Sequence, residues 1–258
     1  MARAAVAAAL VLAIGAGAPS SAGAAATGLA SPAKKEIAMR LVSSAENSSL
    51  NWRAQYRYIE DIRDGRGYTA GIIGFCSGTG DMLEVVQAYT RARRHNPLAR
   101  FIPALKRVNG SDSHAGLGKK FVVAWRRAAK KPAFRRAQNL ARDHVYFNPA
   151  VALAKQDGLQ SLGQFAYYDA AVVHGFEGMQ GVRERALARA ATRAAGGSEA
   201  AYLEAFLDER VVEMKKEAAH EDVTRIETAQ RRFLREGNLD LALPLRWAVY
   251  GDKFSIQR

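Results

Sequence analysis

Two acidic residues, Glu46 and Asp64, stand in settings that suit acid–base chemistry. Glu46 lies at the end of an amphipathic helical pattern, and Asp64 belongs to a Gly-rich turn. Glycoside hydrolysis requires two carboxylic acids on separate rigid elements, with space for water between them. One protonates the departing sugar oxygen, and the other activates a water or attacks the ring. The alternative is that both are ordinary surface residues, since most Asp and Glu side chains face water.

The neighbours of this pair favour a carbohydrate site. The stretch is rich in aromatic side chains, whose faces can stack on sugar rings: Trp52, Tyr56, Tyr58 and Tyr68. Arg66 and Thr69 follow Asp64 closely, which puts a cation and a hydroxyl near the candidate base.

Longer runs make a family resemblance specific. They include LVSSAENSSL around Glu46, DGRGYT from Asp64 to Thr69, GIIGFCSGTGDMLE up to Glu84, YFNP from Tyr146, and LGQFAYYD ending at Asp169. These runs resemble the secreted bacterial chitosanases of glycoside hydrolase family 46, and the likeness covers nearly all of the chain after its leader. The resemblance implies a mainly α (α+β), two-lobed, lysozyme-like fold with a small β-hairpin or sheet near the catalytic cleft. It also implies endo-hydrolysis of the β-1,4 bonds of chitosan, a polyglucosamine, with inversion.

The resemblance assigns roles to individual residues. It makes Glu46 the general acid and Asp64 the general base, with Thr69 holding the attacking water beside Asp64. An acid at Glu46 must keep its proton through burial or a nearby anion, whereas Asp64 must stay ionised. Three further residues match a charge network behind the pair, although they could equally form a structural ion-pair cluster: Asp169, Arg210 and Arg225.

Substrate contacts follow from the same resemblance. The matching positions, where carboxylates would pair with glucosamine ammonium groups, are Tyr58, Arg66, Asp81, His174 and Glu217. Two departures put the subsites in doubt. The loop after His174 is shorter than in the family pattern, and Glu221 stands where Asp is more usual.

The net charge of +13 ordinarily indicates a polyanion partner such as nucleic acid. Runs such as Arg91 to Arg94 and Arg183 to Arg193 alternate with alanine, which favours solvated helix faces and no nucleic-acid partner. A polycationic substrate would then need a local acidic cleft. Its candidate carboxylates are Glu60, Asp61, Asp81, Glu84, Glu217, Glu221 and Asp222.

The amino terminus is typical of a secretory signal peptide. A basic start, a short apolar run and an Ala22-Gly23-Ala24 pattern predict removal of residues 1–26, leaving one two-lobed catalytic domain over 27–258. The apolar run is shorter than the ~20 residues of a membrane span. We therefore expect a secreted, extracellular monomer without membrane contact.

The sequence contains no pattern typical of redox or metal chemistry. Cys76 is the single cysteine, in an apolar run typical of a buried thiol. No metal-binding motif is present, so no metal or cofactor is expected.

Helical patterns dominate after the leader. Ser31-Pro32 marks the start of the first helix, a helix from Thr79 or Asp81 runs to Thr90, and another starts at Asn96-Pro97. Long helices are predicted over about 119–146, 149–174, 199–219 and 223–236, with breaks at Gly175–Gly181 and Ala194–Ser198 and an irregular tail from Gly237. The stretch from Tyr58 to Cys76, with its glycines and its β-prone run over 71–75, predicts a small hairpin or sheet, and these are the only predicted strands. Trp52, Trp125 and Trp247 are interpreted as core residues.

Two other function classes remain open at this point. One is a lysozyme-like muramidase acting on peptidoglycan, and the other is a non-catalytic secreted protein that binds polyanions. The carboxylate pair favours an enzyme, and the candidate acidic cleft favours a cationic polymer over an acetylated one.

Overall fold

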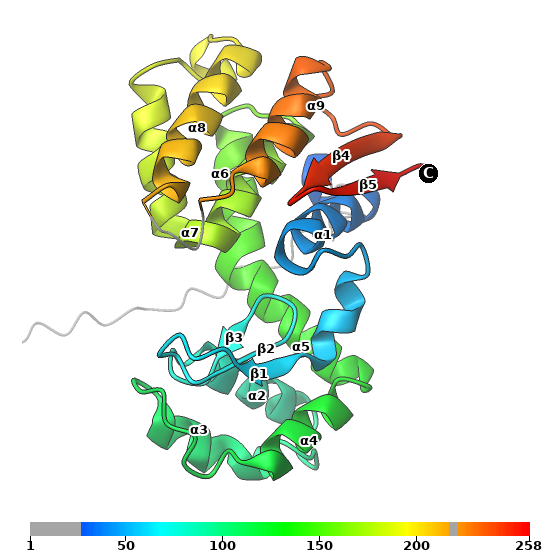
Figure 1. Cartoon of the computed structure of the whole chain (residues 1–258), viewed down its shortest axis with the longest axis vertical. Helices are drawn as coiled ribbons and strands as arrows, with labels where there is room; N and C mark the ends of the chain where they lie inside the picture. The colour runs from blue at the N-terminus through cyan, green and yellow to red at the C-terminus, as the bar shows by residue number, and fades with distance from the viewer. Residues whose placement is uncertain (1–26, 217–220) are drawn as a thin grey trace, which may run out of the picture.

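The computed structural model describes residues 27–216 and 221–258. The chain forms two lobes, one above the other in Figure 1, and each has its own hydrophobic core. The fold is mainly helical with two small antiparallel sheets, which confirms the predicted mainly α, lysozyme-like class. The predicted leader and Glu217 lie outside the described residues, and the domain boundary at residue 27 stays a prediction.

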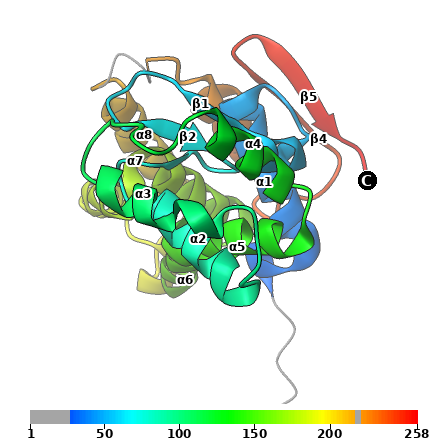
Figure 2. The ribbon, with the colours of Figure 1, turned by 90° about the horizontal axis from the view of Figure 1, so that it is seen from below.

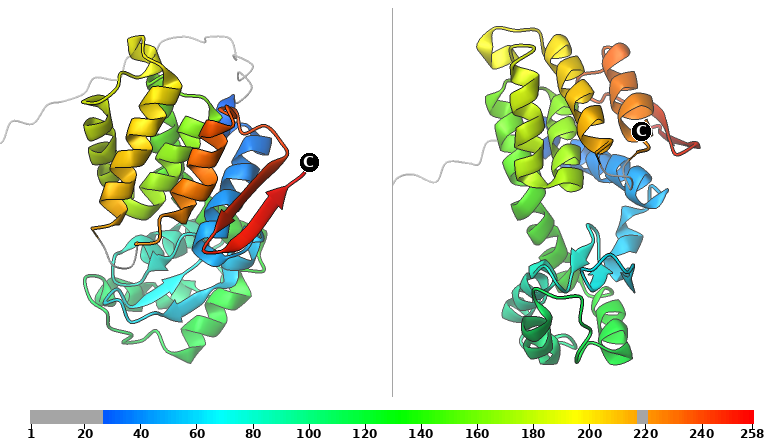
Figure 3. Two further views of the ribbon diagram at one scale, coloured as in Figure 1. Left: turned by 45° about the horizontal axis from the view of Figure 1, so that its top comes forward. Right: turned by 60° about the vertical axis from the view of Figure 1, so that its left-hand side comes forward.

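The large lobe packs helices side by side and closes one flank with a hairpin next to α1 (Figure 3, left). Its core residues come from the first helix and from the second half of the chain. Its elements are η1 (Gly28–Ala30), α1 (Pro32–Asn47), α6 (Asn148–Gln156), α7 (Ser161–Leu187), η5 (Arg193–Ala195), α8 (Glu199–Met214), the π-helical η7 (Arg225–Gln230), α9 (Arg231–Arg235), β4 (Leu245–Val249) and β5 (Asp252–Ile256).

The small lobe packs four helices against a three-stranded sheet of order β1-β2-β3 (Figure 2). The register pairs Glu60 with Thr69 and Thr69 with Cys76, so Thr69 lies on the central strand. The elements of this lobe are β1 (Ile59–Asp61), β2 (Tyr68–Ala70), β3 (Phe75–Cys76), α2 (Asp81–Ala92), η3 (Ala99–Phe101), α3 (Ile102–Val108), α4 (Lys119–Ala128) and α5 (Pro132–Arg142).

Two connections join the lobes, as the right-hand view of Figure 3 shows. One is the 3-10 segment η2 (Trp52–Arg57), and the other runs from α5 through the π-helical η4 (Asp143–Phe147) into α6. Trp52 packs against both cores, and its indole Nε1 donates to Glu36 of α1. The lobes are therefore fixed to each other at two points beside the site.

Several predicted boundaries are confirmed. Helix α1 starts at Pro32 after Ser31, α2 starts at Asp81, and Ser198 precedes α8 with its hydroxyl accepting from the Ala201 amide. Trp125 and Trp247 are buried core residues, and Cys76 is a buried free thiol. Among the described helices, none has the length and apolar content needed to cross a bilayer.

Other local predictions are wrong. The tail after Gly237 contains the hairpin β4-β5, whose Leu245, Trp247 and Val249 face the core with the alternation of a half-buried strand. The sheet predicted between Tyr58 and Cys76 is present as β1, β2 and β3, but the run over 71–75 is mostly a turn, because Gly71 and Gly74 adopt positive φ.

The longest predicted helices are interrupted or shifted. The pattern over 119–146 divides before Pro132, and the pattern over 149–174 divides at Gly158, which adopts a φ of 76°. Conversely, the predicted break after His174 is only a kink at Gly175 inside α7. Arg93 and Arg94 lie just beyond the end of α2 rather than on its face.

Candidate active site

Glu46 occupies the last turn of α1 on the large lobe. Leu41, Val42 and Ala45 bury one face of this helix in the core, and Ser48 ends it in a left-handed conformation. The Glu46 carboxylate is 43% exposed, and its Oε1 accepts a hydrogen bond of 2.6 Å from Nη1 of Arg225. The partner of this carboxylate is thus a cation, not the burial or nearby anion that the sequence argument required.

A buried charge network lies behind Glu46. Asp169 of α7 accepts a hydrogen bond of 2.7 Å from Nη2 of Arg225. Its other carboxylate oxygen lies 2.7 Å from Nη2 of Arg210 on α8. Burial favours the neutral form of Asp169, but the two arginines outweigh it and hold its pKa well below the usual range. The structure therefore brings together the three residues predicted to form the network.

Gln230 completes the network and was not anticipated. Its Nε2 donates to Oδ2 of Asp169 at 2.8 Å, and its Oε1 accepts from Nη1 of Arg210 at 3.1 Å. Gln230 is the last residue of η7, the segment that begins with Arg225. A lone Gln in a helical pattern carries no sequence signal for this role.

Asp64 lies in the tight β1-β2 loop of the small lobe. Arg63, Gly65 and Gly67 adopt positive φ there, and a Cβ on Gly67 would collide with the Ser77 hydroxyl. The loop wraps the Arg66 guanidinium around the Asp64 carboxylate, with Nε at 2.8 Å and Nη2 at 2.5 Å from Oδ2.

The Arg66 contacts keep Asp64 in the form that a general base needs. Partial burial alone would raise the pKa of this carboxyl, but the hydrogen bonds from Arg66 outweigh it, so its pKa falls below the ordinary value. The side chain of Asp64 remains 25% exposed, so solvent and ligands can reach it.

Both lobes contribute to one cleft of about 510 Å³. The large lobe lines it with Val42, Glu46, Asn47, Val172 and Val173, and the small lobe with Tyr58, Ile62, Arg66, Thr69 and Gly71–Gly74. Thr69 is buried in the cleft wall, with its Oγ1 3.5 Å from Sγ of Cys76. Four predicted site residues, Glu46, Tyr58, Arg66 and Thr69, therefore share this cleft.

Asp64 is not itself among the lining residues but is hydrogen-bonded to Arg66, which is. Two predicted substrate contacts also lie outside this lining. Asp81 sits at the start of α2, where its Oδ1 accepts hydrogen bonds from the amides of Cys76 and Met82 and from the Thr79 hydroxyl. Burial raises the pKa of Asp81 against the effect of these bonds. His174 precedes the kink of α7 and follows the cleft residue Val173.

The predicted acidic cleft is only partly recognisable. None of its described candidate carboxylates lines the cavity, although Glu60 and Asp61 lie on β1 between the cleft residues Tyr58 and Ile62. Asp222 instead accepts from the amide and hydroxyl of Thr224. In residues 27–216 and 221–258, no three His, Cys, Asp or Glu side chains are grouped as a metal site would require.

Tyr146 also joins the candidate site. It is half-buried on η4, the connection between the lobes. Burial raises the pKa of its phenol, the charges of Asp81 and Cys76 add to this, and Arg66 opposes it. The run Tyr146-Phe-Asn-Pro was among the matches to the family, and this run was the available signal.

Comparison with known proteins agrees with this geometry. The model of glycosyl hydrolase family 46 matches residues 40–245. A chitosanase of Streptomyces sp. (strain N174) is 61% identical over 89% of this chain and 84% of its own length. A chitosanase of Bacillus subtilis (strain 168) is 36% identical over 82% of this chain and 80% of its own length.

Solved structures give the same answer. The co-crystal structure of chitosanase OU01 with substrate superposes with a TM-score of 0.85 at 57% identity, covering 89% of this chain and 99% of the other. A native chitosanase from Bacillus subtilis MY002 superposes with a TM-score of 0.78 at 32% identity, covering 86% and 98%. The chain is a glycoside hydrolase, and it belongs to glycosyl hydrolase family 46.

Proposed function

We propose that this glycoside hydrolase is an inverting endo-chitosanase that cleaves β-1,4 bonds between glucosamine units of chitosan. The names of its relatives support chitosan as the substrate. The observation that carries the mechanism is the division of labour across the cleft. Glu46 comes from the large lobe, and the loop of Asp64 and Arg66 comes from the small lobe.

In the proposed reaction Glu46 donates its proton to the glycosidic oxygen as the bond from that oxygen to the anomeric carbon breaks. Asp64 takes a proton from a water, and the oxygen of this water bonds to the anomeric carbon from the opposite face. The β-linkage thus gives an α-product. Exchange of both protons with solvent restores the starting state.

Arg225 orients the Glu46 carboxyl group. Once the proton has left, the new carboxylate faces a guanidinium 2.6 Å away, so its negative charge is stabilised. Asp169 balances the buried Arg225 charge and fixes its direction. We assign Asp169, Arg210 and Arg225 to positioning and charge balance, not to contact with substrate.

Thr69 is proposed to hold the attacking water. Thr69 lies on β2, five residues after Asp64, and its side chain forms part of the cleft wall. A hydroxyl can donate to one oxygen while it accepts from another, which suits the orientation of a water. Tyr58, Arg66, Asp81, His174 and Glu217 remain proposed substrate contacts.

The test measures release of reducing ends from chitosan, chitin and peptidoglycan by the purified chain, with Glu46→Gln as the blank. We expect release from chitosan that greatly exceeds release from the other two polymers. Preferential hydrolysis of peptidoglycan would instead identify a muramidase. Activity of the Glu46→Gln blank equal to that of the native chain would refute the acid assignment.

We also propose that residues 1–26 are removed on secretion and that the mature enzyme acts extracellularly as a monomer. The basic start, apolar run and small-residue pattern of the leader support this. Amino-terminal sequencing of protein from the culture medium and light scattering of the same sample test both points. A retained leader or a dimer mass would contradict them.

A further inference from the structure

The positive charge of the chain is concentrated in one lobe. Residues 53–142 contain 19 Lys and Arg but only 6 Asp and Glu. Residues 27–52 and 143–258 contain 18 Lys and Arg and 19 Asp and Glu. The small lobe therefore carries almost the whole net charge, although the proposed substrate is itself a polycation.

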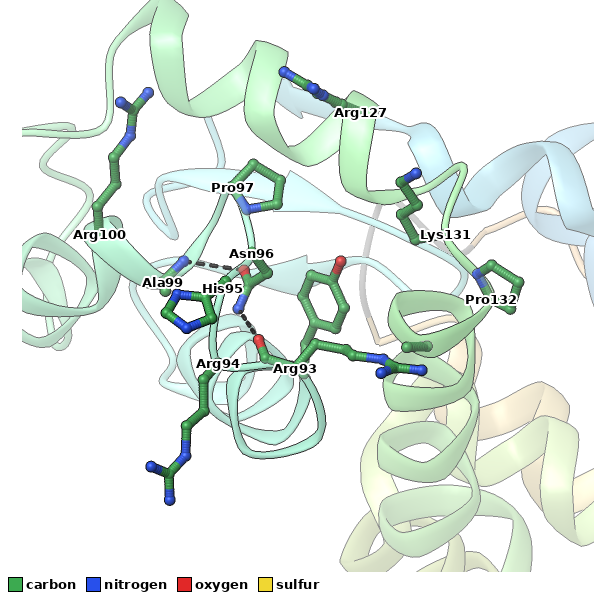
Figure 4. A pocket seen from close by; sticks show the side chains of 12 residues that line it. Arg93, Arg94, His95, Asn96, Pro97, Ala99, Arg100, Arg127, Lys131 and Pro132 are labelled. Atoms are coloured by element: carbon green, nitrogen blue, oxygen red, sulfur yellow. Dashed lines mark hydrogen bonds between the residues drawn. The ribbon is translucent and has the colours of Figure 1, made fainter.

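The excess charge surrounds two adjoining cavities of the small lobe. The larger, of about 900 Å³, is lined by Arg93, Arg94, Arg100, Arg127 and Lys131, which Figure 4 shows around it. The neighbouring cavity, of about 490 Å³, shares Arg127 and adds five further cations: Arg53, Arg57, Arg126, Lys130 and Arg135. No Asp or Glu lines either one, and we name the two cavities together the basic groove.

The basic groove is separate from the catalytic cleft. No residue lines both, and α4, which carries Arg126 and Arg127, lies on the side of the small lobe that is farther from the large lobe in Figure 1. A chitosan chain in the cleft would gain nothing from these cations, because like charges repel.

Arginines of the large lobe, in contrast, form ion pairs with carboxylates. Arg183 pairs with Asp157 at 2.7 Å, and Arg189 pairs with Asp208 at 2.8 Å. Of the ten Lys and Arg residues that line the basic groove, only Arg53 has a carboxylate within ion-pair distance among the described residues, that of Glu36 at 2.9 Å. Clustered like charges destabilise a compact protein by self-repulsion, and a bound polyanion would relieve it.

The chemistry of the groove selects among polyanions. Arginine forks bind phosphate oxygens in pairs, and nine neighbouring cations without a carboxylate partner suit a chain with regularly repeated charge. Nucleic acid strands also require exposed aromatic faces on which bases stack. The two tyrosines of the cavities, Tyr89 and Tyr56, are only 3% and 4% exposed, so the single imidazole of His95 is the one exposed aromatic ring in their lining.

We propose that the basic groove is a second binding site, which takes a linear phosphate polymer without bases. Such a site would hold the enzyme on an anionic surface while the cleft stays open to its cationic substrate. The inference concerns binding alone and does not depend on the proposed catalytic roles.

The test measures binding of fluorescently labelled inorganic polyphosphate to the full chain at 50 and 200 mM salt. The groove variant is Arg93→Gln, Arg94→Gln and Arg127→Gln. The control variant, with the same loss of net charge, is Arg235→Gln, Arg246→Gln and Lys253→Gln on the exposed surface of the large lobe.

We expect the groove variant to bind polyphosphate at least about tenfold more weakly than the native chain, and the control variant to bind like the native chain. Affinity of the native chain should fall steeply between the two salt concentrations. Chitosan hydrolysis by both variants should stay near the native rate, which shows that they fold.

Two outcomes would overturn the proposal. Equal weakening in both variants would mean that the total charge, not the groove, attracts polyphosphate. Tighter binding of single-stranded DNA than of polyphosphate of the same charge would mean that the groove takes nucleic acid.

Discussion

The two lobes hold their candidate catalytic carboxylates in opposite ways. On the large lobe, Glu46 rests on ion pairs among Arg225, Asp169 and Arg210, all of them buried. On the small lobe, Asp64 is held by Arg66 alone, in contact with solvent. The candidate acid is therefore positioned by the core, whereas the candidate base is positioned by one loop. Changes behind Glu46 should therefore affect folding, and changes beside Asp64 should affect chemistry alone.

The largest expected effect is on turnover. Glu46→Gln and Asp64→Asn should each lower kcat by about 10²–10⁴-fold, because each removes one proton transfer. Both side chains are partly exposed, so the thermal unfolding midpoints should stay close to that of the native chain. Glu184→Gln and Asp252→Asn, both at exposed positions, are matched controls that should keep full activity. Near-native turnover of either cleft variant would remove that residue from the mechanism.

Stability should respond next, and only on the large-lobe side. Asp169→Asn leaves two buried arginines without their shared anion, which should cost about 3–5 kcal/mol in the free energy of unfolding. The matched change Asp208→Asn removes a carboxylate that is 44% exposed and should cost less than about 1 kcal/mol. Denaturant titrations of both variants measure the difference. Equal costs would contradict the contrast between the two lobes.

The same carboxylate gives a pH dependence with a definite sign. The pKa of Asp169 is depressed in the folded chain, so its contribution to stability is present above the ordinary carboxyl pKa of about 3.9. That contribution is lost as the pH falls below this value. The stability gap between the native chain and Asp169→Asn should thus be constant above about pH 5 and shrink in acid. A gap that widens in acid would reverse the assignment.

Substrate affinity should change by a smaller amount at Asp81. Asp81→Asn keeps an oxygen for the amides of Cys76 and Met82 but loses the charge. If the other carboxylate oxygen pairs with a glucosamine ammonium, KM for chitosan should rise by the equivalent of about 1.5–3 kcal/mol. If neither KM nor the unfolding midpoint changes, Asp81 does not bind substrate, and its role is to connect β3 with α2.

The smallest effect concerns the pH profile. Arg66 holds the pKa of Asp64 below its ordinary value, so Arg66→Ala should raise that pKa. Since a general base must be ionised, the acidic limb of kcat/KM should move to higher pH. Arg66→Lys, which keeps the charge, should move it less. If Arg66→Ala leaves the acidic limb unchanged, ionisation of Asp64 does not control kcat/KM.

The sequence predicted those parts of the site that local patterns encode. The Ser31-Pro32 start and the apolar stripe of the first helix place Glu46 at its end, and the glycines around Asp64 predict a turn. Family runs brought in Asp169, Arg210 and Arg225, residues far apart in the chain that meet in the core.

Features that depend on tertiary contacts were not predictable in the same way. Arg225 binds Glu46 although the two residues are 179 positions apart in the sequence. No local pattern indicates that the carboxyl group of Glu46 would pair with a cation instead of being buried. Gln230 joins the network only because η7 packs beside α7 and α8. The hairpin β4-β5 was missed because its short strands lie in a segment rich in turn residues, including Asn238 and Pro244.

The anomeric configuration of the first product tests the central claim most directly, namely that an acid on one lobe and a base on the other act together in a single displacement. Proton NMR of chitosan hydrolysis, recorded before mutarotation equilibrates the products, reports this configuration. The account predicts that the α-anomer forms first. Initial formation of the β-anomer would require a covalent intermediate and would contradict the role of Asp64 as a base.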